Sequence, residues 1–303
     1  MKKMLVLLSV LLILSVPAFA AETYRMKVSS PNGAPGLALA VLAAENPEDY
    51  NYVAAETISA EFAAAKADFI IAPVNAGAKL YKAGKSGYRL AAVVTWGNLY
   101  FASQREGFSS EMINGADITL FGENTINAAV ALYAMEQNGL KPASVQYLAG
   151  AANTQALLIS DSDAIVLTAE PALTAASLKN DKITAFALND LYKTAAGLEG
   201  YAQAGLFVNP MTAEEHPEEV KSYLALAADA VGKCTSDVSA VAEVAVQLEI
   251  LPNVKVAQLA IPRCALRYVT AAEARKDVEL TAAIDLSQFG GALPADDFYY
   301  EAP

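Results

Sequence analysis

The sequence predicts an α/β protein built from mainly parallel sheets flanked by helices. Short apolar segments of strand length alternate with segments of helical periodicity, and this alternation starts again near the middle of the 303-residue chain. Size is a further indication, because a chain of this length can hold two domains of about 100–200 residues each. We therefore expect two runs of strands and helices, each forming a sheet of its own.

The N-terminus predicts a cleavable signal peptide at 1–20. Two lysines precede an apolar run at 4–16, and the small-residue triplet Ala-Phe-Ala at 18–20 ends the segment. Thirteen helical residues reach only about 20 Å, less than the ~30 Å hydrocarbon core of a bilayer, so a permanent membrane anchor is disfavoured. We expect cleavage after Ala20 and no lipid anchor, because no cysteine stands at the cleavage site.

Composition excludes several classes of partner. Removal of 20 residues from 303 leaves 283, with 19 basic and 33 acidic residues and a net charge of −14. Nucleic acid is disfavoured because phosphate binding needs clustered Lys and Arg. No second apolar run approaches twenty residues, so no stable membrane insertion is expected after cleavage. Cys234 and Cys264 could form one disulfide in an oxidising compartment, a pairing that the sequence leaves open.

The first run of elements occupies the N-terminal third. Strands are expected at 25–29, 67–72 and 90–95, with a further extended segment at 99–103. Leu37, Ala40, Val41 and Ala44 recur at helical spacing, so a helix with Pro35 in its first turn is expected to end before 47. Shorter helices are expected after Ser59 and around 78–82.

The second run begins at 117. Its strands are expected at 117–121, 145–148, 164–168, 183–188 and 205–208. A long helix follows the first of these strands and is expected to stop at Gly139, and further helices are expected to open near 153 and at Pro171. After 208 only helices are expected, two of them opened by the capping boxes Thr212–Glu215 and Thr270–Glu273.

Four segments in this order resemble a known family: ADFIIAPVNAG at 67–77, TWGNLYFAS at 95–103, DAIVLTAEPAL at 163–173 and GLFVNPMTAEEHPEEVKSYL at 205–224. The family is the type 2 periplasmic solute-binding proteins of ABC transporters, in the NMT1/THI5-like branch that includes taurine, sulfonate, nitrate and thiamine-precursor binding proteins. The resemblance extends over nearly the whole chain after 20. Two features depart from it: Asn114 and Gly115 replace the usual lysine-glycine, and the C-terminal helices are alanine-rich.

The resemblance implies two lobes joined by two crossing strands. Lobe I would combine 22–98 with 207–303, lobe II would be 99–206, and the hinge segments would lie near 99–103 and 205–208. It also implies a monomeric periplasmic carrier without a cofactor, which captures a small polar organic molecule between its lobes and delivers it to an ABC permease and ATPase. An exported enzyme on the same fold and a ligand-binding sensory protein are the alternatives.

Open parallel sheets bind ligands beyond the carboxyl ends of their strands, which selects the loops at 32–34, 74–77, 96–98, 122–127, 151–154 and 168–171. Five of these loops contain asparagine and none contains Lys or Arg. Asparagine is also common at turns and helix caps, so a structural role stays open for each one. The candidate ligand-binding residues are Asn32, Gly33, Asn75, Trp96, Asn98, Asn124, Thr125, Asn153, Thr154 and Glu170.

Two of these candidates have alternative roles. Trp96 could stack on a flat ligand or pack the hinge, and Glu170 could bind a ligand amine or stabilise the N-terminal end of a helix. The single histidine, His216, lies in an acid-rich surface segment, which disfavours a His-based catalytic pair and a multi-His metal site. We therefore expect neither catalysis nor a metal.

Overall fold

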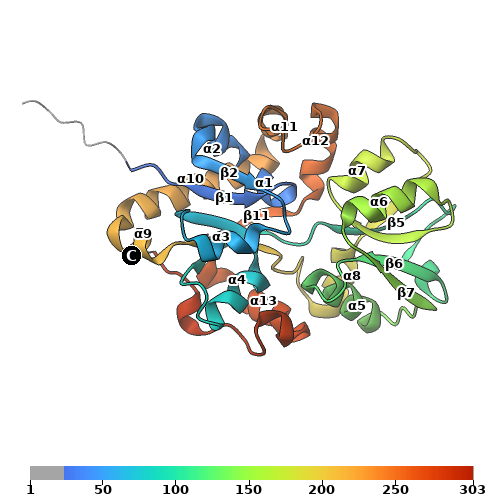
Figure 1. Ribbon diagram of the computed structural model, residues 1–303. Coiled ribbons are helices and arrows are strands. Elements are labelled where there is room, and N and C mark those ends of the chain that lie inside the picture. Colours follow the sequence, from blue (N-terminus) through green and yellow to red (C-terminus); the bar gives the residue numbers. More distant parts are fainter. Residues whose placement is uncertain (1–23, 303) are drawn as a thin grey trace, which may run out of the picture.

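The computed structural model describes residues 24–302, which form two lobes with one β-sheet each (Figure 1). The expected signal peptide at 1–20 lies outside the described residues. The first sheet has six strands in the order β11-β4-β10-β3-β1-β2, and the second has five in the order β7-β6-β8-β5-β9. The α/β class expected from the sequence is confirmed.

The strands fall into the two sheets according to their place in the chain. Those of the first sheet are β1 (Val28–Pro31), β2 (Tyr50–Val53), β3 (Phe69–Pro73), β4 (Arg89–Thr95), β10 (Ala204–Val208) and β11 (Leu266–Thr270). Those of the second are β5 (Leu99–Ser103), β6 (Asp117–Phe121), β7 (Ser144–Leu148), β8 (Ile165–Ala169) and β9 (Thr184–Ala187).

Helices cover both sheets. The first lobe contains α1 (Ala34–Leu37), α2 (Ala40–Glu45), α3 (Ile58–Ala64), α4 (Val74–Lys82), α9 (Pro210–Glu215), α10 (Pro217–Ser236), α11 (Val238–Gln247), α12 (Val254–Ala260) and α13 (Ala271–Ile284), with short 3-10 turns η3 (Ile261–Arg263) and η4 (Leu286–Phe289). The second contains α5 (Ile126–Gln137), α6 (Ala151–Ser160), α7 (Ala172–Ser177) and α8 (Leu188–Ala196). Among residues 24–302 no helix combines the length and apolarity that a bilayer span requires.

Each sheet is mainly parallel, and the antiparallel strands are β10 and β11 in the first sheet and β5 in the second. β1, β2 and β3 pair in parallel, and β10 lies antiparallel between β3 and β4, so β1 to β4 share one direction. In the second sheet β5 lies antiparallel between β8 and β9, while β6 pairs in parallel with β7 and β8. β5 and β10 are the first strands that the chain forms after passing into the other lobe, which accounts for their reversed direction.

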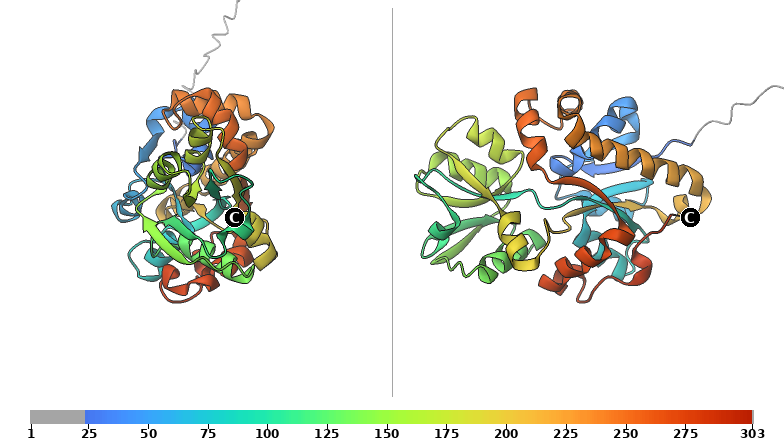
Figure 2. Two further views of the ribbon diagram at one scale, coloured as in Figure 1. Left: turned by 90° about the vertical axis from the view of Figure 1, so that its right-hand side faces the viewer. Right: turned by 180° about the vertical axis from the view of Figure 1, so that it is seen from behind.

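The chain crosses between the lobes at 96–98 and again at 197–203, and the right-hand view of Figure 2 shows both segments between the two sheets. The segments near 99–103 and 205–208, expected as hinges, are regular strands that begin directly after each crossing. Asn189 Nδ2 donates to the carbonyl oxygens of Trp96 and Gly97, both at 2.9 Å. Gly97 has φ +87°, and a Cβ there would lie 2.6 Å from the Tyr201 ring, so the crossing needs a glycine at this position.

Two expectations about the first lobe are wrong. The part after 208 is not purely helical, because β11 pairs antiparallel with β4 at the edge of the sheet. β11 has no apolar run in its sequence, since its side chains are half-buried or exposed. The other edge strand, β2, was not expected for the same reason.

One of the two expected capping boxes is confirmed. Thr270 caps α13, and its hydroxyl and the carboxylate of Glu273 satisfy each other's backbone N–H groups. Thr212, in contrast, lies inside α9, which is capped by Asn209. The Thr212 hydroxyl instead donates to Asp68 Oδ1 at 2.6 Å, because the start of α9 folds back onto the end of the loop before β3.

Candidate ligand-binding cleft

A cavity of about 300 Å3 lies between the two lobes. It is lined by residues from both: Pro31, Asn32, Pro35, Ala55, Ile58, Pro73, Asn75, Ala76, Asn98, Thr125, Ile126, Asn127, Gln203, Ala204 and Gln288. Every polar side chain in this set is an amide or a hydroxyl, and none is ionisable. This volume would hold about ten water molecules at liquid density, the scale of a small organic solute.

The strand ends explain why these residues meet. Pro31 and Pro73 are the last residues of the parallel strands β1 and β3, and Thr125 follows β6 in the second sheet. Gln203 directly precedes β10, whose reversed direction brings its beginning to the same edge. The cavity therefore lies beyond the carboxyl ends of strands in both sheets, where open parallel sheets bind their ligands.

A chain of amide hydrogen bonds connects the crossing segments with the second lobe. Asn98 Nδ2 donates to the backbone oxygen of Glu170 at 2.8 Å, and Gln203 Nε2 donates to Asn98 Oδ1 at 2.9 Å. The same Nε2 lies 3.4 Å from Asn127 Oδ1, which also accepts from the Tyr201 hydroxyl at 2.8 Å. These bonds hold three amide side chains in fixed orientations at the cavity wall.

Among the described side chains that line the cavity, Asn75 carries the one polar atom that is both buried and unpartnered, its amide oxygen. It is buried and has no hydrogen-bond partner among residues 24–302. A buried acceptor without a partner costs roughly 1–3 kcal/mol, so such an atom at a cavity wall indicates a position that a ligand donor can occupy.

Four of the ten candidate residues line the cavity: Asn32, Asn75, Asn98 and Thr125. Thr125 also caps α5, its hydroxyl oxygen accepting the Ala128 N–H at 3.4 Å. The other six lie outside the lining: Gly33, Trp96, Asn124, Asn153, Thr154 and Glu170.

Trp96 packs the hinge. Its side chain is only 3% exposed, its indole N–H donates to the backbone oxygen of Arg267 at 2.9 Å, and the Arg267 guanidinium lies 4.4 Å from the ring centroid. These contacts occupy both the N–H and the ring with first-lobe partners. Of the two roles that the sequence left open, the contacts correspond to hinge packing.

Glu170 joins the two lobes. Its side chain is fully buried, and Oε1 lies 2.8 Å from Nε of Arg263 in η3 of the first lobe, whose guanidinium also lies 4.6 Å from the Tyr100 ring centroid. Oε2 accepts the Thr174 N–H in the first turn of α7 at 3.1 Å, so the helix-stabilising role is present. Burial raises the pKa of the Glu170 carboxyl, and the Arg263 charge opposes this shift.

The remaining candidates are structural or exposed. Asn124 has φ +59° and its backbone oxygen accepts Gln288 Nε2 at 2.9 Å, a second contact between the lobes. Asn153 is exposed on α6, whereas Thr154 is buried and its hydroxyl donates to a backbone oxygen of the same helix. Gly33 precedes α1 with φ +91°, a backbone role.

Asn127, Gln203 and Gln288 line the cavity but are missing from the ten candidates. Asn127 lies in one of the selected loops, and Gln203 is the last polar residue before an apolar strand at the second crossing, so both carried a signal in the sequence. Gln288 carried none, because it comes from a short 3-10 turn near the C-terminus that only tertiary packing brings to the cleft.

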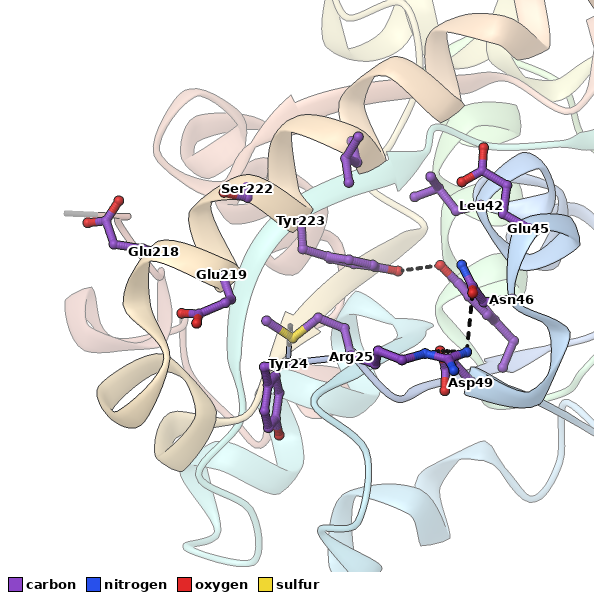
Figure 3. Close-up of a pocket in the computed structure, with 13 residues that line it drawn as sticks. Tyr24, Arg25, Leu42, Glu45, Asn46, Asp49, Glu218, Glu219, Ser222 and Tyr223 are labelled. Atoms are coloured by element: carbon purple, nitrogen blue, oxygen red, sulfur yellow. Dashed lines mark hydrogen bonds and ion pairs between the residues drawn. The ribbon is translucent and has the colours of Figure 1, made fainter. Parts of the chain in front are cut away.

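A larger groove of about 620 Å3 lies on the first lobe alone, between α2 and α10 (Figure 3). Five of its polar side chains pair with one another: Arg25 donates to Asp49 at 2.7 Å and to Asn46 at 3.2 Å, and the Tyr50 and Tyr223 hydroxyls are 2.9 Å apart. The groove takes no residue from the second lobe and is lined by several ionisable side chains, unlike the cavity. We therefore take the cavity as the candidate ligand site.

Histidine, cysteine and carboxylate side chains are the candidate metal ligands and nucleophiles of the described residues. No group of three or more His, Cys, Asp or Glu side chains in residues 24–302 could hold a metal ion. His216 stacks on Tyr24 with ring centroids 3.8 Å apart. Cys234 and Cys264 are free and buried in one apolar cluster, and burial raises the pKa of the Cys234 thiol to about 12.

No family model and no curated protein matches the chain. Several solved structures match the chain. An ABC transporter structure from Parabacteroides distasonis matches with a TM-score of 0.77 and 21% identity over 92% of this chain and 99% of that chain. The ligand binding component of an ABC-type import system from Staphylococcus aureus, with zinc bound, matches with a TM-score of 0.69 and 12% identity over 91% and 96%.

The periplasmic aliphatic sulphonate binding protein SsuA from Escherichia coli matches with a TM-score of 0.68 and 14% identity over 92% of each chain. At 12–21% sequence identity these comparisons show the fold and do not identify the solute. The agreement covers both lobes, because more than nine tenths of this chain is superposed in each of the three comparisons. The chain therefore has the two-lobed fold of periplasmic binding proteins.

Proposed function

We propose that this protein is the solute-binding component of an ABC importer, and that it captures a small polar organic molecule between its lobes and delivers it to a membrane permease. The observation that carries the proposal is the cavity between the lobes, which takes polar groups from both and contains a buried amide oxygen without a partner. A periplasmic location and a place in the branch that includes the sulfonate and thiamine-precursor binding proteins belong to this proposal.

The contacts between the lobes support binding by closure. Glu170 pairs with Arg263, and Gln288 donates to the backbone of Asn124, so the first and second lobes already meet at two places beside the cavity. A solute that contacts both walls would add to these contacts and favour the closed arrangement. The proposal includes no catalytic step, since the lining offers neither a nucleophile with a base nor an ionisable acid.

A thermal-shift screen of ligand-stripped protein tests the proposal. A panel of amides, amines, sulfonates and nitrate should contain one class that raises the melting temperature, because a ligand that binds only the folded state stabilises it by mass action. Gln203→Leu should abolish the response, since it removes the residue that connects Asn98 and Asn127. Asn153→Leu, on the exposed face of α6, is the matched control and should retain it.

Two results would count against the proposal. One is the absence of any shift across the panel and across an extract of the source cells. The other is an equal loss of response in Gln203→Leu and Asn153→Leu, which would place the responding site outside the cavity.

A further inference from the structure

A single backbone oxygen sets the orientation of three of the amide side chains at the cavity, those of Asn98, Gln203 and Asn127. The carbonyl of Glu170 can only accept, so Asn98 must present Nδ2 to it and turn Oδ1 toward Gln203. Gln203 must then present Nε2, which it shares between Asn98 Oδ1 and Asn127 Oδ1. The Tyr201 hydroxyl, which donates to the same Asn127 oxygen at 2.8 Å, agrees with this assignment.

These hydrogen bonds leave some polar atoms of the cavity wall without a partner. Gln203 Oε1 and Asn127 Nδ2 have no partner among residues 24–302, and Asn75 Oδ1 is buried without one. On these three cavity residues two acceptors, Gln203 Oε1 and Asn75 Oδ1, and two donor groups, Asn127 Nδ2 and Asn75 Nδ2, therefore have no partner in the described chain. A solute that satisfies them must bring hydrogen-bond donors as well as an acceptor.

The charges around the cavity limit the solute further. None of its fifteen lining residues is ionisable, so a charged solute would lose hydration without gaining a counter-charge. The nine-residue α4 and the twelve-residue α5 both begin at the cavity, and the positive partial charge of their N-termini disfavours a cation. A sulfonate or phosphate could face those N-termini, but it brings acceptors only and would leave the Gln203 oxygen, whose orientation follows from the Glu170 carbonyl, without a donor.

Size and apolar surface complete the description. The rest of the wall is aliphatic, formed by proline, alanine and isoleucine side chains, and no aromatic ring lines it. Stacking of a flat ring on an aromatic side chain is therefore not part of recognition at this cavity.

We propose that the solute is an uncharged, aliphatic compound that carries an N–H donor beside a carbonyl acceptor, as in a carboxamide, a urea or a lactam. This inference rests on the proposed function, because it specifies the solute of the same cavity. Its donors would serve Asn75 Oδ1 and Gln203 Oε1, and its carbonyl oxygen would accept from Asn127 Nδ2.

The test uses three probes made from the small-molecule extract of the source cells and their spent medium: the acidic, the basic and the neutral fraction from ion exchange. Each is added to ligand-stripped protein, and the melting temperature is measured. The neutral fraction should raise it, by about 5 °C if the solute reaches 100 times its Kd. The response should be equal at pH 5.5 and 8.5, since no lining group titrates between these values.

A response to the acidic or the basic fraction alone would overturn the inference and leave the proposed function standing. A response to no fraction would contradict the proposed function itself. The two failures are thereby distinguished.

Asn75→Leu provides a second measurement that does not depend on the fractions being complete. Removing an unsatisfied buried acceptor should leave the melting temperature of the empty protein unchanged or raise it, yet weaken the response to the neutral fraction at least tenfold in concentration. Asn153→Leu is the control and should alter neither. An Asn75→Leu protein that responds like the wild type would refute a donor at this position.

Discussion

Replacing Arg263 by methionine should destabilise the protein in a manner that depends on pH. Arg263 is the cationic partner of the fully buried Glu170 carboxylate, and its removal leaves that carboxylate without a counter-charge. The buried group then escapes by taking up a proton. The carboxyl has an ordinary pKa of 4.5, so it is ionised in the unfolded chain at neutral pH. Keeping it protonated in the folded protein lowers the free energy of unfolding by about 1.36 kcal/mol for each pH unit above 4.5. The loss is therefore at most about 3.4 kcal/mol at pH 7 and about 0.7 kcal/mol at pH 5.

The sign follows from proton linkage. Because burial raises the pKa of Glu170, the folded protein binds this proton more tightly than the unfolded chain does. Stability is therefore greatest below pH 4.5 as far as this group is concerned, and it is lost as the pH rises through the folded pKa. Loss of Arg263 removes the charge that opposes the shift, so the decline with pH should become steeper in the variant.

Urea unfolding of the ligand-free protein at pH 5, 6 and 7 measures the effect. Arg267→Met is the matched control, because Arg267 also lies over an aromatic ring but has no carboxylate partner in the described chain. It should cost about 0.5–1 kcal/mol at every pH. An Arg263→Met cost that stays constant from pH 5 to 7, or that equals the cost of Arg267→Met, would refute the account of Glu170 as a buried charge held by Arg263.

Four further outcomes are expected. Gly200→Ala should destabilise by about 1–3 kcal/mol, because its Cβ would lie 2.1 Å from the Trp96 carbonyl oxygen; Gly232→Ala, on an open helix face of α10, should stabilise by about 0.5–1 kcal/mol in the same unfolding assay. Thr270→Ala should cost about 1 kcal/mol through loss of the α13 cap, and an unchanged unfolding midpoint would contradict the capping box. Cys234 should resist alkylation at pH 8 in the native protein and react in urea, as mass spectrometry can show, since burial raises its pKa to about 12; rapid labelling of native protein would show that the thiol is accessible.

Strands with an apolar run were predicted from the sequence, and strands without one were missed. β5 and β6 are interior strands of the second sheet, each paired on both sides. Their apolar runs predicted strands at 99–103 and 117–121, which are the bounds that the structure has. In the first sheet the edge strands β2 and β11 expose part of each face and carry no such run, whereas the edge strands β7 and β9 of the second sheet were expected from their sequences. The pairing of β2 and β11 is decided by the neighbouring strand rather than by their own residues.

Of the two predicted helix N-caps, one depends on local residues alone and the other on a tertiary contact. The box formed by Thr270 and Glu273 is a local pattern, complete within four residues, and it is confirmed. Thr212 and Glu215 have the same spacing but sit in a helix that starts earlier, at Pro210, and the Thr212 hydroxyl serves the distant Asp68. A contact over 144 residues of sequence could not be derived from local spacing.

The sequence by itself determined the α/β class, the positions of most strands along the chain and the prevalence of uncharged polar residues at their carboxyl ends, because periodicity and turn chemistry are local properties of the chain. It also placed Asn32, Asn75, Asn98 and Thr125 among the candidates. Only the tertiary structure decided which of the ten face one cavity, since that depends on how two separately formed sheets are joined at 96–98 and 197–203. The same joining turned Glu170 toward an arginine of the other lobe and brought Gln203 and Gln288, far apart in the chain, to the wall of the cleft.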